Sequence, residues 1–260
     1  MSGALARIAV RGLWVGFGSK PVLRGIDLVL HEGESLVVIG ASGAGKSVLL
    51  KTILGLIEAW EGSVRVDGIE VVGASSAARE QVREKIGMLF QGAALFDSLP
   101  VWENVVFGLL ARGRLARGEA REAALAALAE VGLGGEVADR YPAELSGGMR
   151  KRVGLARAIA ADPEILFFDE PTSGLDPIRA DAINQLIRRT VRGRGRTALS
   201  ISHDMASVRK IADRVAMLYE GRIIWEGPVE RMEHSGNPYV DQFVHGRAEG
   251  PMTASVAGAG

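Results

Sequence analysis

The chain has 260 residues, in which Lys plus Arg and Asp plus Glu balance at 31 each, and it contains no cysteine. The balanced charge gives no argument for nucleic acid or an anionic membrane as a partner, and we expect no nucleic-acid partner. The lack of cysteine excludes disulfides, thiol catalysis and cysteine-ligated zinc. Apolar runs such as residues 165–168 fall far short of the roughly 20 residues that span a bilayer. We therefore expect any work at a membrane to need another chain, and the arginines and glycines near the start predict no export signal.

The first part of the chain has the pattern of strands. Residues 5–39 alternate short apolar runs with turn residues, which predicts antiparallel strands followed by a buried strand at 36–39. SVLLKTILGLI, residues 47–57, has helical spacing, and GSVRVDGIEV predicts two strands around an Asp-Gly turn. The region therefore combines an antiparallel β part with the start of an α/β part.

The middle of the chain changes character. Residues 91–143 are rich in alanine and helical in pattern, which predicts an inserted helical subdomain at about 92–150. EILFFDE, DPIRADAINQLIRR and TALSISHD then restore the strand and helix alternation of a mainly parallel sheet. We expect one domain at 1–246 and a tail at 247–260 whose last ten or so residues are mobile. The arginine-rich residues 188–197 are interpreted as a solvated loop rather than a nucleic-acid patch.

A glycine-rich loop predicts a phosphate site. GASGAGKS fits G-x-x-x-x-G-K-[ST] and lies between a predicted strand and a predicted helix, as that motif requires. Glycines let backbone N–H groups surround phosphate oxygens, the lysine adds a charge at the β and γ phosphates, and the last hydroxyl can bind Mg²⁺. A chance glycine-rich turn is the alternative. We predict ATP and Mg²⁺ as ligands of Gly40, Ser42, Gly43, Ala44, Gly45, Lys46 and Ser47.

Two strand ends carry candidate catalytic residues. ILFFDE ends in Asp169 and Glu170, whose side chains point to opposite faces if the strand continues straight. We assign Asp169 to Mg²⁺ and Glu170 to polarising the water that attacks the γ-phosphate. The alternative is two charges that simply end a strand. His203 follows LSIS and is predicted to contact the γ-phosphate and orient that water, against the alternative of a structural histidine.

The stretch LSGGMRKRVGLARAIA begins a predicted helix with a hydroxyl and two glycines. A helix start carries unpaired N–H groups and the positive end of the helix dipole. Ser146, Gly147 and Gly148 are therefore a candidate anion seat, with an ordinary serine N-cap as the alternative.

With GASGAGKS, Gln91, LSGGM, ILFFDE, SGLD and His203 in this order, the sequence resembles the nucleotide-binding subunit of ABC transporters over nearly its full length. The resemblance implies an α/β P-loop NTPase (RecA-like) core with an antiparallel β subdomain and an inserted α-helical subdomain. It also implies a homodimer in which Ser146, Gly147 and Gly148 bind the γ-phosphate of ATP held by the second subunit, and in which Asp176 crosses the interface.

The same resemblance assigns two further residues. Gln91 is expected to contact Mg²⁺ and the water and to sense a transmembrane partner. Phe17 falls where the family stacks an aromatic ring on adenine, with Trp14 as a weaker candidate and a core position for Phe17 as the alternative.

MLFQGAALFDSLPVWENVVFGL, SGGMRKRVGLARAIA and NPYVDQFVHGRAEGP resemble the ATPase of the Mla phospholipid-transport system. That likeness implies work with an integral membrane permease, an MCE-type lipid-binding subunit and a small STAS-type accessory subunit. It implies a peripheral position on the cytoplasmic face of the bacterial inner membrane. Another cargo is the alternative. Phe96 and Trp102 are expected to be exposed and to pack on the permease, with core packing as the alternative.

Other classes fit less well. A DNA-remodelling ABC protein would place a long coiled coil between Gln91 and Ser146, but Ser146 follows Gln91 by only 55 positions and the stretch between them has no heptads. A P-loop kinase has no use for LSGGM with SGLD. A scaffold without turnover would be expected to lose Glu170 or His203, and both are present.

Overall fold

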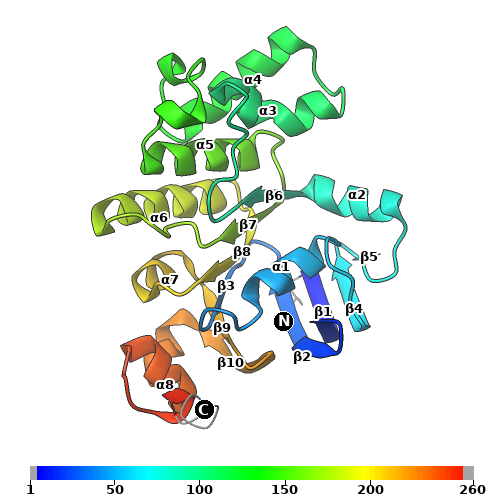
Figure 1. The fold of residues 1–260 in the computed structure, drawn as a ribbon, viewed down its shortest axis with the longest axis vertical. Helices are drawn as coiled ribbons and strands as arrows, with labels where there is room; N and C mark the ends of the chain where they lie inside the picture. The colour runs from blue at the N-terminus through cyan, green and yellow to red at the C-terminus, as the bar shows by residue number, and fades with distance from the viewer. Residues whose placement is uncertain (1–4, 254–260) are drawn as a thin grey trace. The chain divides into compact units, whose positions relative to one another are not determined.

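The computed structural model describes residues 5–253, which divide into two compact units, residues 5–79 with 200–253 and residues 80–199. The first unit carries an antiparallel sheet in the order β2-β1-β4-β5, drawn in blue and cyan in Figure 1. Its bounds are β1 Ala6–Phe17, β2 Lys20–His31, β4 Glu61–Val66 and β5 Ile69–Glu70. Alternate residues of β1 and β2 are buried, as the sequence pattern predicts.

The first unit also contains parallel structure. β3 (Ser35–Ile39) is buried along its length and pairs in parallel with β9 (Arg214–Tyr219), whose other neighbour is β10 (Arg222–Pro228). α1 (Lys46–Ile53) follows β3 and is shorter than predicted, because Gly55 with φ +67° ends it. The unit closes with α7 (Met205–Ile211), η3 (Val229–His234) and α8 (Pro238–His245).

The chain after α8 folds back on that helix. The buried Gln242 accepts a hydrogen bond from Met252 N at 2.8 Å and donates to Arg247 O at 3.2 Å and Thr253 Oγ1 at 2.8 Å. Residues 247–253 are therefore held, and the rest of the predicted mobile tail, 254–260, lies outside the described residues.

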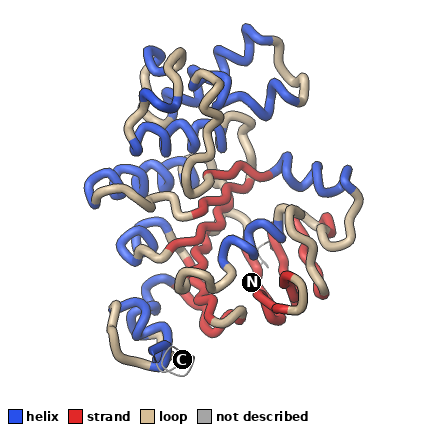
Figure 2. Tube along the Cα trace, viewed as in Figure 1, coloured by secondary structure: helices blue, strands red, loops and turns tan. Residues whose placement is uncertain are grey.

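The second unit is built on β6 (Ile86–Leu89) and β7 (Ile165–Asp169), which pair in parallel. β7 lies between β6 and the start of β8 (Thr197–Ser202), the strand in which the division of the units falls. α2 (Ser76–Lys85) leads into β6, and neither that helix nor β6 is predicted from the sequence. The mixture of sheets and helices confirms the α/β class (Figure 2).

Helices fill most of the second unit. α3 (Val101–Ala111), α4 (Arg117–Glu130) and α5 (Gly147–Ile159) pack on one another, and they are drawn together in green in Figure 1. Short turns η1 (Gly135–Val137) and η2 (Pro142–Glu144) join α4 to α5, and α6 (Pro177–Arg192) follows β7. The helical character expected of residues 91–143 is present, while the limits of a subdomain at 92–150 stay a prediction.

The arginine-rich residues 188–197, expected to be a solvated loop, instead include the end of α6 at residues 188–192. Arg196 is buried and pairs with Asp162 at 2.6 Å, and Arg194 pairs with Asp162 at 2.9 Å and with Glu130 at 2.5 Å. These ion pairs tie the end of α6 to the chain before β7.

Candidate active site

The predicted phosphate loop joins β3 to α1 in a conformation that only glycine adopts easily. Gly40, Gly43 and Gly45 have φ of +152°, +79° and +103°. A Cβ on Gly40 would lie 2.3 Å from Leu218 O, and one on Gly45 would lie 2.9 Å from Leu23 Cδ2. Glycine at the outer positions is therefore required both by the backbone angles and by the space around them.

Lys46 closes this loop from inside. Its side chain is buried, and Nζ donates to Gly40 O at 2.7 Å and to Ala41 O at 2.9 Å. Gly45 is the N-cap of α1 and has no side chain that could cap the first turn of that helix. The loop therefore offers backbone N–H groups and a cation at one helix start, which suits a phosphate chain.

Asp169 and Glu170 follow each other at a sharp turn. Asp169 is the last residue of β7 and Glu170 has φ +48°, so the strand does not continue straight. Both residues are buried, at 8% exposure each. The turn continues with a hydrogen bond from Ser173 N to Glu170 O at 3.2 Å. The two carboxylates therefore leave the strand on different parts of one turn, which allows the division of roles that the sequence suggests.

Gln91 lies in an exposed turn just after β6. Ala93 and Ala94 in this turn have φ of +62° and +46°, and Ala93 is buried. Two basic side chains of α5 bind its carbonyl groups. Lys151 donates to Gln91 O, and Arg157 donates to Ala93 O at 2.5 Å and to Ala94 O at 2.7 Å. Sequence reasoning missed both residues, because a basic run at a helix start is usually solvated.

Lys151 also reaches the turn after β7, where its Nζ donates to Glu170 O at 3.2 Å. Burial lowers the pKa of Lys151, and the charges of Asp169 and Glu170 oppose that shift. Burial alone likewise lowers the pKa of Arg157. Both cations are thus held in surroundings that disfavour their charge.

α5 begins with a serine N-cap, which fits both the anion seat and the ordinary serine cap that the sequence allows. Ser146 Oγ accepts from Met149 N at 3.3 Å, and Gly147 and Gly148 are the first residues of the helix. α6 begins beside it, since a Cβ on Gly147 would lie 3.8 Å from Leu175 Cδ2 and one on Gly148 would lie 3.9 Å from Arg179 Cδ. The second unit therefore presents two helix starts side by side.

Asp176 is the N-cap of α6. Its carboxylate accepts from Ile178 N at 3.1 Å and Arg179 N at 3.0 Å. The hydrogen bond from the Arg179 backbone lowers the pKa of Asp176 most, and the charge of Arg179 adds to that effect. Capping of α6 is thus a role of Asp176 within one chain, beside the role that the sequence predicts across an interface.

His203 and Phe17 are both accessible. His203 directly follows β8 and is exposed, while Phe17 at the end of β1 is 57% exposed, so the core alternative for Phe17 is wrong. Trp14 is half-buried, and the guanidinium of Arg222 lies 6.0 Å from its ring centroid. Phe17 is therefore the ring of the first unit better placed to meet a flat ligand.

The expected exposure of Trp102 is wrong. We expected it to be exposed, but it is 6% exposed, and Arg117 and Arg121 lie 5.2 and 5.6 Å from its ring centroid. As a residue of the first turn of α3 it faces the helical packing. Phe96, in contrast, is 44% exposed, as predicted.

Phe96 lies in a groove of about 720 Å³ on the second unit. Its ring centroid is 4.5 Å from that of Phe107, which is 40% exposed. Ala94 and Arg157 also line the groove, which places it directly beside the turn that carries Gln91. Three charged side chains of α2 also line the groove, Glu80, Arg83 and Glu84, together with Arg112 at the C-cap of α3.

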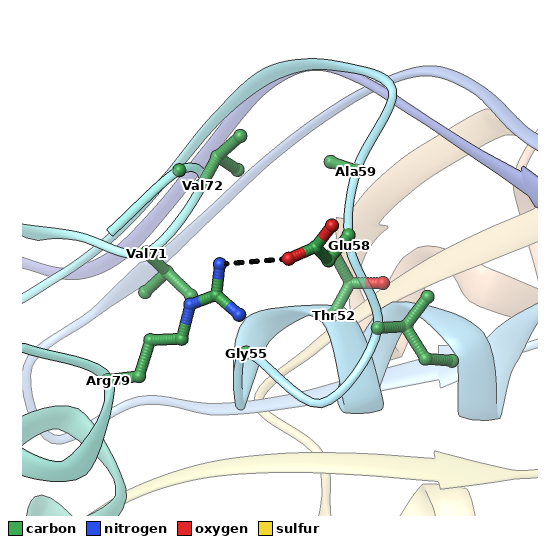
Figure 3. A pocket seen from close by; sticks show the side chains of 9 residues that line it. Thr52, Gly55, Glu58, Ala59, Val71, Val72 and Arg79 are labelled. Carbon is green, nitrogen blue, oxygen red and sulfur yellow. Dashed lines mark hydrogen bonds and ion pairs between the residues drawn. The ribbon is translucent and has the colours of Figure 1, made fainter. Parts of the chain in front are cut away.

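A smaller cavity of about 180 Å³ lies in the first unit, beside the end of α1 (Figure 3). Arg79 and Glu58 lie across it and form an ion pair at 3.4 Å. Thr52 and Gly55 line it from the α1 side. Its lining contains none of the predicted site residues.

The donor set predicted for Mg²⁺ suits that ion. A serine hydroxyl, an aspartate and an amide oxygen are hard ligands of the kind that magnesium takes beside phosphate oxygens and water. Within residues 5–253 there is no group of three or more His, Cys, Asp or Glu residues able to hold a metal.

Fold and loop together define a P-loop nucleotide-binding protein. The chain belongs to the ABC transporter family, whose pattern matches residues 23–173. This membership confirms the resemblance seen in the sequence, the P-loop NTPase class of the core and the ligands ATP and Mg²⁺. The protein is an ATP hydrolase and the ATPase subunit of an ABC transporter.

Curated relatives cover nearly all of the chain. The probable ribonucleotide transport ATP-binding protein mkl of Mycobacterium tuberculosis is 39% identical over 95% of this chain and 69% of its own length. The chloroplastic protein TRIGALACTOSYLDIACYLGLYCEROL 3 of Arabidopsis thaliana is 41% identical over 94% and 75%. The methionine import ATP-binding protein MetN of Caulobacter vibrioides is 43% identical over 92% and 71%.

Solved structures agree. The dimeric ATP-binding cassette MJ0796, bound to ADP and Pi in a post-hydrolysis state, has a TM-score of 0.78 and 31% identity over 85% of this chain and 98% of that one. The protein cbiO1 of Clostridium perfringens, part of the ABC transporter complex cbiONQ, has a TM-score of 0.79 and 28% identity over 97% and 99%. Cassettes of this family dimerise and work with membrane permeases. Among residues 5–253, no helix has the length and apolar character needed to cross a bilayer.

Proposed function

We propose that this chain powers phospholipid transport between the inner and outer membranes, as a homodimer on the cytoplasmic face of a bacterial inner membrane. It works with a separate permease, an MCE-type lipid-binding subunit and a small STAS-type accessory subunit. The observation that carries the link to a permease is the groove beside the Gln91 turn, with the exposed rings of Phe96 and Phe107 in it.

Nucleotide binding is assigned first to the phosphate loop. Its backbone N–H groups, from Gly40 to Ser47, and the Lys46 ammonium bind the β and γ phosphates, and Phe17 stacks on the adenine. Ser47, Gln91 and Asp169 would hold Mg²⁺, which would supply positive charge at the phosphates.

Hydrolysis is assigned to two residues. The Glu170 carboxylate accepts a proton from the attacking water, and His203 contacts the γ-phosphate and orients that water. Because Glu170 is held in a left-handed backbone conformation and is 8% exposed, its carboxylate has few positions available.

The start of α5 acts on the other copy's nucleotide. Ser146, Gly147 and Gly148 seat the γ-phosphate at the positive end of the helix dipole, and Asp176 lies at the same interface. The neighbouring starts of α5 and α6 support this, because both would face a second copy together.

The groove takes a segment of the permease. It combines apolar rings with charged residues at its rim, a composition suited to an amphipathic helix. Since Phe96 and Ala94 of the groove belong to the loop that starts at Gln91, occupancy of the groove acts on a Mg²⁺ ligand.

Phospholipid is the proposed cargo. Three stretches of sequence resemble the Mla ATPase, and one relative is named for a diacylglycerol lipid. Other relatives are named for ribonucleotide transport and methionine import, so an ATPase of an importer or exporter for another cargo is the second candidate.

Reconstitution tests the cargo. The complex purified through this chain is expected to contain a permease and an MCE-type subunit, and to move labelled phospholipid between vesicles and carrier only with ATP. A matched complex with Glu170→Gln controls for leakage. A complex with a solute-type permease and no lipid would overturn the cargo and leave the ATPase standing.

A further inference from the structure

Lys151 is a buried cation that the proposed roles leave unused. Its side chain is 5% exposed, and its Nζ donates to the carbonyl oxygens of Gln91 and Glu170. These two residues belong to separate loops, one after β6 and one after β7. A single ammonium group therefore joins the turn that begins at Gln91 to the turn that carries Glu170.

A lysine is a costly choice for a position that only fills space. Removing an ammonium group from water is unfavourable unless its donors are matched by acceptors. Neighbouring buried positions of α5 hold Val153 and Leu155, which pack without any such cost. Lysine instead brings three donors on a flexible stem, which suits contacts to more than one carbonyl.

Both loops need support from outside their own backbone. Glu170, Ala93 and Ala94 all have positive φ, a backbone conformation that is strained for a residue with a Cβ. Arg157, further along α5, binds the carbonyls of Ala93 and Ala94. α5 thus holds the Gln91 turn at three carbonyl groups, and at Lys151 the same helix holds Glu170.

We propose that Lys151 is a positioning residue for ATP hydrolysis, which fixes the Gln91 turn and the Glu170 backbone to one point on α5. A displacement of the Gln91 turn when a permease segment occupies the groove then changes where the Glu170 carboxylate lies. This inference rests on the roles proposed above for Gln91 and Glu170, and it does not depend on the cargo.

The first test separates binding from chemistry. Lys151→Met keeps the length of the side chain and removes its donors, so kcat is expected to fall about 10- to 100-fold, as misplacement of a reacting group does. KM for ATP is expected to stay within about twofold. Arg152→Met is the matched control, because Arg152 is the next residue of α5 and donates to Val131 O at 3.1 Å, away from both turns. An unchanged kcat in a folded Lys151→Met protein overturns the proposal.

The second test asks whether Lys151 acts through Glu170. Single-turnover rates of Lys151→Met, Glu170→Gln and the double variant form a cycle. If Lys151 positions Glu170, the double variant hydrolyses at the rate of Glu170→Gln within about twofold, since residues that act as a unit are not additive. Multiplicative losses would show a general structural role and overturn the proposal.

The experiments distinguish a failure of the proposed role of Glu170 from a failure of the inference about Lys151. If Glu170→Gln alone does not slow hydrolysis, the proposed role of Glu170 fails. If it does slow hydrolysis and Lys151→Met does not, only the inference about Lys151 fails. If the methionine variant folds poorly, Lys151→Gln, which keeps an N–H donor, replaces it in the test. The kcat of Lys151→Gln is expected to lie between the kcat values of wild type and Glu170→Gln, and a kcat equal to that of wild type counts against the proposal.

Discussion

Asn104 is expected to be one of the most sensitive polar residues of the second unit. Its side chain is fully buried in α3 and holds the chain between β6 and that helix. Oδ1 accepts from Phe96 N at 2.7 Å, and Nδ2 donates to Leu99 O at 2.9 Å, Phe96 O at 3.0 Å and Pro100 O at 3.3 Å. Asn104→Ala removes all of these contacts at once.

The magnitude follows from the donors and acceptors involved. One acceptor and two N–H groups amount to three hydrogen bonds, each worth about 1 kcal/mol net. The loss is therefore about 3 kcal/mol, and at about 2–4 °C per kcal/mol the Tm is expected to fall by about 6–12 °C.

Thermal unfolding measured by circular dichroism checks this value. Gln185→Ala is the matched amide control, because Gln185 makes an exposed hydrogen bond to Asp181 at 2.8 Å, and its stability is expected to change by less than about 0.5 kcal/mol. Because Asn104 fixes the backbone of Phe96, stimulation of ATP hydrolysis by the permease should also weaken. A Tm for Asn104→Ala within about 2 °C of wild type would refute the reasoning.

Four further outcomes are expected. Glu170→Gln should bind ATP but lower the turnover rate by roughly 10²- to 10⁴-fold, the loss expected when a general base is removed, and phosphate release measures this rate. Light scattering of the same variant should detect dimers in ATP and not in ADP. Equal dimer fractions in the two nucleotides would contradict ATP-driven assembly. A hybrid of Lys46→Ala and Ser146→Arg chains should regain partial activity that both homodimers lack, because in trans one of its two sites is intact; a verified hybrid with no activity argues against that arrangement. Glu70→Gln should reduce stability at pH 7 and make little difference in acid. Burial opposes charging of Glu70, but bonds from Ser63, Val64, Arg65 and Val72 outweigh it and lower its pKa below 4.5, so this stability is present above pH 4.5 and lost as pH falls through the lowered pKa. Urea unfolding at both pH values checks it, and an equal loss at both would exclude the carboxylate charge as the cause.

The fold was predictable where local pattern decides structure. Alternating residues predicted β1 and β2, and the glycine-rich motif placed the start of α1 correctly because its spacing is fixed by the shape of the loop. The pattern could not place the end of α1, since ILGLI continues the helical spacing past Gly55. β6 was missed because four residues are too few to show a period.

Site residues divide in the same way. Lys46, Asp169 and Ser146 stand in motifs whose chemistry can be read from residue types and order. The positions of Lys151 and Trp102 could not be predicted in this way, because the burial of a lysine or a tryptophan depends on which residues it contacts in the folded chain. Lys151 is buried because its ammonium binds the carbonyls of Gln91 and Glu170, and the guanidinium groups of Arg117 and Arg121 lie over the ring of Trp102.

The amide of Gln242 determines where a label can be attached to this protein. Because it binds residues 247, 252 and 253 at once, the contacts of the first unit reach as far as Thr253, past Gly246, the last residue of the predicted domain. A purification tag or fluorophore fused after Gly260 leaves these contacts in place. A shorter version cut at Gly246 would leave this buried amide without three partners, so a truncation made for crystallisation should keep residues 247–253.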